Sequence, residues 1–122
     1  MISRRSDWRL LPPSGIAITP FQPTRYPGVS IHFYRSDRGS GHAAVPIRME
    51  PGCGYPAHRH VGPEELLVLQ GGFRDEQGVW RAGEYARFET GSSHAPIALD
   101  EGEACVFFAI AHKGIALFAR GD

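Results

Sequence analysis

The chain has 122 residues, which suits one domain and leaves no room for a second core of useful size. Its 13 Lys and Arg residues balance 13 Asp and Glu residues, so no net charge attracts a polyanion, and nucleic acid is not an expected partner. Residues 1–15 lack the apolar run of a signal peptide or membrane span, and the two cysteines form neither a CxxC pair nor a disulfide-rich pattern. We therefore expect a cytoplasmic protein that has no membrane partner.

Glycine and proline, 15 and 10 residues, are spread along the chain, and no stretch keeps helical apolar spacing for three turns. Short strands are therefore expected. Residues 29–34 and 43–49 alternate apolar and polar side chains, as half-buried strands do, and Pro46 predicts that the second of these lies near a sheet edge. The other expected strands cover residues 55–60, 64–70, 73–75, 79–81, 84–88, 94–99, 104–111 and 115–119.

Many short strands with tight connections predict an all-β fold in which the sheet closes or doubles, because closure removes exposed edges. A jelly-roll barrel fits best. We expect a Pro-rich lead over residues 1–25 and a barrel domain over residues 26–119. The remaining barrel edges and the lead segment favour a homodimer.

Four residues around two turns form a candidate metal site. His58 and His60 are two residues apart in an extended segment, so their side chains leave the same face. Glu64 begins the next strand just beyond a Gly-Pro bend, and His94 begins another after a glycine turn. Three nitrogens and one oxygen suit one divalent transition metal such as Zn, Fe, Ni, Cu or Mn, and such a set leaves a coordination position open.

The plainer interpretation treats these histidines as ordinary loop residues. The combined spacing of His58, His60, Glu64 and His94 arises by chance in roughly one in a thousand chains of this composition, so we favour the metal site. Glu65 is the alternative carboxylate. Strand alternation places it on the face opposite Glu64, and only Glu64 keeps a six-residue spacing before Gly71.

The segment from Pro51 to Gly71, PGCGYPAHRHVGPEELLVLQG, resembles the first cupin motif, and Gly91 to His94 resembles the core of the second. More narrowly, both segments resemble the cupin domain of ChrR-type anti-sigma factors. The resemblance covers about residues 26–111 and implies an RmlC-like cupin, a double-stranded β-helix whose metal ligands are His58, His60, Glu64 and His94.

The sequence also departs from these families. Glu89 and Ala98 stand where the second motif usually has Pro and often has Asn, which leaves the ligands intact. The N-terminal zinc module of ChrR-type factors, with its His and Cys-x-x-Cys, has no counterpart in this chain. We therefore do not expect the chain to bind a sigma factor by itself.

Stand-alone domains similar to this one include metal-dependent dioxygenases that cleave carbon–carbon bonds in diketones and hydroxy ketones. The chain is thus interpreted as such an enzyme or as a zinc-binding sensor or small-molecule-binding module; a metal-free sugar isomerase is disfavoured by the complete ligand set. No catalytic residue beyond the metal ligands is assigned. Six strand residues are candidates for the barrel mouth, although a packing or surface role is expected for each: His32, Arg48, Tyr55, Phe73, Arg87 and Phe107.

Overall fold

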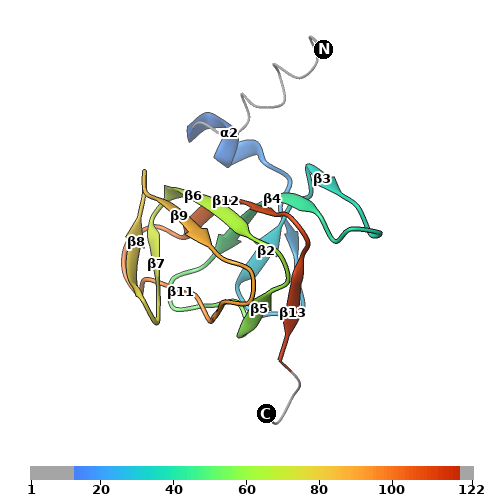
Figure 1. The fold of residues 1–122 in the computed structure, drawn as a ribbon. Helices are drawn as coiled ribbons and strands as arrows, with labels where there is room; N and C mark the ends of the chain where they lie inside the picture. Colours follow the sequence, from blue (N-terminus) through green and yellow to red (C-terminus); the bar gives the residue numbers. More distant parts are fainter. Residues whose placement is uncertain (1–12, 119–122) are drawn as a thin grey trace.

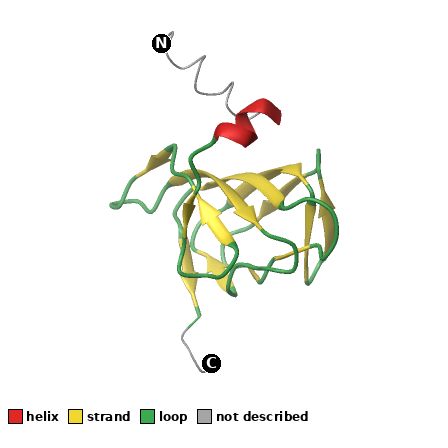
Figure 2. Ribbon diagram, turned by 180° about the vertical axis from the view of Figure 1, so that it is seen from behind, coloured by secondary structure: helices red, strands yellow, loops and turns green. Residues whose placement is uncertain are grey.

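The structure is a computed structural model that describes residues 13–118, which form a nearly all-β barrel with one short helix outside it (Figure 1). The helix is α2 (Pro13–Ile18), and it lies beyond one end of the strands in both views (Figure 2). No helix in this described range is long and apolar enough to cross a bilayer. The strands are β1 (Gln22–Pro23), β2 (Val29–Ile31), β3 (Arg35–Ser36), β4 (Ala43–Met49), β5 (His58–His60), β6 (Glu64–Gln70), β7 (Gly72–Asp75), β8 (Gly78–Arg81), β9 (Tyr85–Phe88), β10 (Ser93–His94), β11 (Ile97–Ala98), β12 (Cys105–Ala111) and β13 (Ile115–Leu117).

All strand pairs are antiparallel, and the strand order is not the chain order. The large sheet runs β1-β2-β4-β12-β6-β9, with β3 also paired to β4, and two three-stranded sheets run β10-β5-β13 and β11-β7-β8. The late strand β12 lies between β4 and β6, which joins the two halves of the chain. This arrangement confirms the expected all-β jelly-roll barrel.

The core lies between the sheets and follows strand alternation. On β6, Glu64, Leu66 and Val68 are buried, whereas Glu65 and Leu67 are not. The apolar run in β12 is mostly buried, and Phe107 on that strand contacts Phe73 on β7, with ring centroids 5.6 Å apart. The inward row of β6 thus carries a carboxylate at one end, followed by the apolar side chains of Leu66 and Val68.

The expected edge position of the strand over residues 43–49 is wrong, because β4 lies inside the large sheet, between β2 and β12. Pro46 is tolerated there for a local reason. Its carbonyl accepts a hydrogen bond from the backbone N–H of His32, so its nitrogen faces the same side, where the pairing partner changes from β2 to β3. The missing N–H therefore falls at the gap between two partner strands.

The expected strand over residues 94–99 is two short strands, β10 and β11, separated by Ala95 and Pro96. Because of this break, β10 pairs with β5, while β11 pairs with β7 in a different sheet. His94 thereby joins the sheet that carries the other two predicted histidine ligands. At Gly71, a Cβ atom would lie 2.7 Å from the carbonyl oxygen of Ala104, so the turn after β6 requires glycine.

Candidate metal centre

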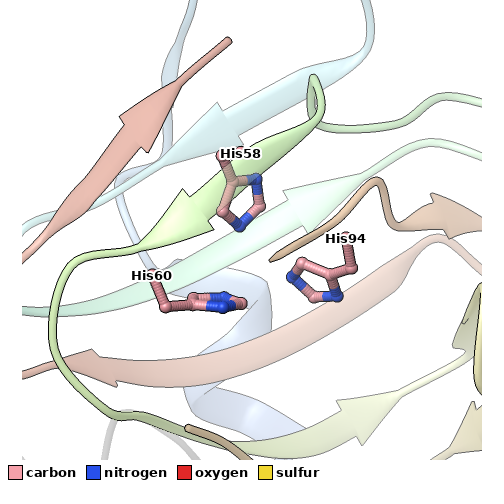
Figure 3. Close-up of side chains that lie close together, drawn as sticks. All are labelled: His58, His60 and His94. Carbon is pink, nitrogen blue, oxygen red and sulfur yellow. The ribbon is translucent and has the colours of Figure 1, made fainter. Parts of the chain in front are cut away.

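Three histidines from two paired strands converge inside the barrel (Figure 3). His58 and His60 lie on the buried face of β5 with Arg59 exposed between them, as alternation predicts. His94 on β10 lies directly across from His58 in the ladder. One ring nitrogen from each of the three lies within 4.8 Å of the others, and all three side chains are buried.

Hydrogen bonds fix the orientation of two of these rings. His58 Nδ1 lies 2.8 Å from the carbonyl oxygen of Pro56, and His60 Nδ1 lies 3.0 Å from both the carbonyl oxygen and Oγ of Ser92. The Ser92 hydroxyl donates to the Glu89 carbonyl at 2.6 Å, so its oxygen accepts from His60. Both histidines therefore carry the proton on Nδ1, which leaves a lone pair on each Nε2.

The third ring is held by a carboxylate. His94 Nδ1 lies 2.9 Å from Oδ2 of Asp75, whose side chain is fully buried. Burial alone would raise the pKa of Asp75, but hydrogen bonds from His94, the Gln77 backbone and the Trp80 indole lower it below its ordinary value. The ionised carboxylate thus fixes the same tautomer at His94. This carboxylate–histidine pair is the usual support of a metal-ligating imidazole.

The Nε2 atom of His60 is fully buried and has no hydrogen-bond partner in the described part of the chain. Oε1 of Glu64 lies 3.3 Å away. With the His60 proton on Nδ1, two acceptor atoms face each other across this short gap, an arrangement that a cation would satisfy. The donor set therefore fits a divalent metal.

The electrostatics of the pocket favour neutral imidazoles. Burial lowers the pKa of His58 to about 4, and burial also lowers the pKa of His60. Burial raises the pKa of Glu64 to about 7, and no positive group within residues 13–118 compensates its charge. Near neutral pH, a cation therefore meets unprotonated Nε2 atoms on His58 and His60 and a carboxyl group that readily gives up its proton.

The two adjacent carboxylates, Glu64 and Glu65, lie on opposite faces of β6. Glu64 is buried beside the histidines, whereas Glu65 lies on the outer face of β6. There Glu65 accepts hydrogen bonds from the Tyr85 hydroxyl at 2.7 Å and from His112 Nε2 at 3.0 Å. Glu65 thus belongs to a surface network and does not face the histidines.

A cavity of about 230 Å³ opens onto this cluster. His58, Glu64 and His94 line one part of it, and β4, β6 and β12 supply apolar walls such as Ile47, Leu66 and Phe107. Among the described residues that line the cavity, no lysine or arginine occurs. The space is therefore an apolar chamber with its polar groups gathered at one side.

Of the six residues considered for the barrel mouth, three line this cavity and three do not. Tyr55, Phe73 and Phe107 are in its wall. Arg48 and Arg87 instead pair with Glu50 and Glu89 on the surface, and His32 packs edge-on against Tyr34.

Sequence reasoning missed Asp75 and gave Ser92 no role. Ser92 lies in the motif before His94, yet its contact is with His60, across the β5–β10 pair. Asp75 ends β7, and only the pairing of β7 with β11 brings it near His94. No local pattern marks either residue, because both contacts depend on strand pairing.

The barrel and its inward-facing histidines define the chain as a cupin with a candidate three-histidine metal centre. The chain belongs to the ChrR Cupin-like domain family, which it matches over residues 12–113. No curated protein sequence matches it.

Solved structures similar to this chain agree with the assignment. An RmlC-like cupin protein from Ralstonia eutropha JMP134 aligns with a TM-score of 0.76 at 21% identity, over 92% of this chain and 73% of that one. The anti-sigma protein ChrR of Rhodobacter sphaeroides, solved in complex with SigE, aligns with a TM-score of 0.68 at 28% identity, over 79% of this chain and 50% of that one. An acetylacetone dioxygenase from Acinetobacter johnsonii aligns with a TM-score of 0.71 at 14% identity, over 82% and 72%. The first and third similarities support the fold alone.

Proposed function

We propose that the chain is a metal-dependent dioxygenase that acts on a small diketone or hydroxy ketone, with the metal held by His58, His60, Glu64 and His94. The observation that carries the proposal is the apolar cavity that opens directly onto the buried histidines. A buried metal site against a closed wall would suit a structural ion, whereas a site that faces a cavity leaves room for a ligand.

The residues around the proposed metal site either orient the histidine rings or contribute charge. Asp75, Ser92 and the Pro56 carbonyl hold the three rings with Nε2 free, so the site is assembled before any ligand arrives. Glu64 adds a negative charge that offsets part of the charge of a divalent ion. Iron(II) bound in such a site supplies the redox chemistry needed for reaction with dioxygen.

The cavity itself limits the substrate. Its volume of about 230 Å³ lies below the roughly 300 to 1,000 Å³ that is usual for drug-sized pockets. Leu66, Phe73 and Phe107 in its wall favour hydrocarbon, and without a lysine or arginine among the described lining residues an anionic tail would find no partner there. A compact molecule with oxygen atoms at one end and hydrocarbon at the other matches these features.

The test is oxygen uptake by protein loaded with iron(II), measured with acetylacetone and with an aromatic hydroxy ketone. We expect uptake above the free-iron background for at least one of them. The zinc-loaded protein should show none, because zinc has no redox chemistry. Uptake that stays at background for the iron form with both compounds would contradict the dioxygenase assignment.

A second candidate function is a ligand-binding module in which zinc has a mainly structural role. The observation that favours it is the similarity to ChrR, which at 28% identity exceeds that to the dioxygenase, at 14%. This function predicts that a ketone raises the melting temperature of the zinc form while the iron form consumes no oxygen. The two assays together therefore separate the two functions.

A further inference from the structure

We infer that Tyr55 determines ligand specificity in this cavity, because its hydroxyl donates a hydrogen bond to an oxygen atom of the ligand that lies beside the histidines. The inference rests on the proposed use of the cavity as a ligand site. It does not require that the ligand be turned over.

The position of Tyr55 places it next to the cluster. It lines the cavity, and its ring meets the ring of His58 edge to face, with centroids 5.4 Å apart and planes at 89°. It lies three residues before the start of β5, in the extended segment that leads into His58 and His60. A ligand that contacts the histidines therefore lies close to Tyr55.

The ring of Tyr55 is also held from behind. Tyr26 contacts it edge to face with centroids 5.3 Å apart, and the backbone N–H of Tyr55 donates to the carbonyl of Pro96 at 3.1 Å. The side chain is half-buried between Tyr26 and His58. A side chain fixed in this way loses little conformational entropy when it binds a ligand.

The hydroxyl of Tyr55 is available. No hydrogen bond joins it to another group in residues 13–118. Because it has no partner among these described groups, the hydroxyl is free to donate to a polar atom supplied by the cavity contents. The oxygen is not sealed in the core, because it is not among the buried unpartnered atoms of the described chain.

The other polar groups around the cavity are already committed. The Nδ1–H groups of His58 and His94 donate to Pro56 and Asp75 and point away from the cluster. Glu64 is a proposed metal ligand. Among the described side chains that line the cavity, Tyr55 is thus the one that offers a neutral O–H donor. A ligand with an oxygen atom near Tyr55 is bound and oriented by this hydrogen bond. A ligand without such an oxygen gains no affinity from the Tyr55 hydroxyl.

The test compares two probes on the cobalt(II)-loaded full chain without oxygen, followed through the visible absorption of the metal. Acetylacetone carries oxygen atoms that can accept a hydrogen bond, whereas ethanethiol binds a metal through sulfur and offers no oxygen. In Tyr55→Phe we expect the affinity for acetylacetone to fall about three- to tenfold and the affinity for ethanethiol to stay unchanged. Tyr85→Phe removes a hydroxyl that lies outside the cavity, where it donates to Glu65 on the outer face of the sheet, and should alter neither affinity.

Several results would overturn the inference. Equal losses for both probes in Tyr55→Phe would show that Tyr55 acts only by packing against His58. Unchanged acetylacetone affinity, or no acetylacetone binding by the wild type, would also contradict it. Metal content measured after each titration verifies that the probe has not removed the cobalt. Because no turnover is measured, failure of the dioxygenase proposal would leave a positive result intact.

Discussion

Asp75→Asn offers a demanding test of how the centre is assembled. The Asp75 carboxylate holds His94 Nδ1 at 2.9 Å and also accepts the Gln77 backbone N–H at 2.9 Å and the Trp80 indole N–H at 3.4 Å. One carboxylate oxygen accepts from Gln77 and Trp80 and the other accepts from His94, whereas an asparagine side chain has only one oxygen. If that oxygen keeps the Gln77 and Trp80 bonds, the amide NH₂ faces His94 Nδ1 and favours the tautomer with its proton on Nε2, where a metal would bind.

The magnitude follows from the bond that is lost. A hydrogen bond to a charged group contributes about 1.5 to 3 kcal/mol, and loss of such a support typically weakens metal binding by about 10- to 100-fold. We therefore expect zinc affinity to fall by about that factor in Asp75→Asn. The assay is competition between the apoprotein and a chromophoric zinc chelator at fixed pH.

Glu76→Gln is the matched control for Asp75→Asn. It removes the same charge from the adjacent residue, which is exposed and accepts only the backbone N–H of Ala95, at 3.3 Å, among the described groups. We expect less than a threefold change in zinc affinity. If both substitutions weakened zinc equally, long-range charge alone would be at work, and the tautomer argument would be refuted.

The remaining predictions concern the two adjacent glutamates. Glu64→Gln should weaken zinc binding far more than Glu65→Gln, because only Glu64 faces the histidines; equal zinc affinities in the same competition assay would contradict the site geometry. In the metal-free protein, Glu64→Gln should instead increase stability. The pKa of Glu64 rises from 4.5 to about 7 on folding, so its negative charge destabilises the fold increasingly as the pH rises through that interval. In urea unfolding of the two apoproteins, the free energy of unfolding of Glu64→Gln relative to the wild type should therefore increase by about 3 kcal/mol between pH 4.5 and pH 7.5. A difference that does not change with pH would refute the assigned burial cost.

Much of the centre was predictable because strand alternation acts over neighbouring residues. The His-x-His spacing predicted one shared face for His58 and His60, and the same rule separated Glu64 from Glu65; the observed burial agrees with both. The motif around Gly91 to His94 predicted the position of the third histidine. These features depend on short sequence segments whose geometry depends little on the rest of the fold.

Features that depend on strand pairing were not predictable in the same way. Pro46 indicated an edge strand, but the change of partner from β2 to β3 accommodates it inside the sheet. Asp75 reaches His94 only because β7 pairs with the strand that follows the Pro96 break. Homodimer formation and the division at residues 25 and 26 stay predictions.

The central claim is that one divalent metal is held by the converging histidines, and the metal content of the purified chain tests it most directly. After equilibration with zinc and gel filtration, the wild type should retain about one ion per chain. The double substitution His58→Ala, His94→Ala should retain almost none, while His32→Ala, His42→Ala, which changes two histidines outside the cluster, should match the wild type. Full zinc retention by the His58→Ala, His94→Ala protein would contradict the account.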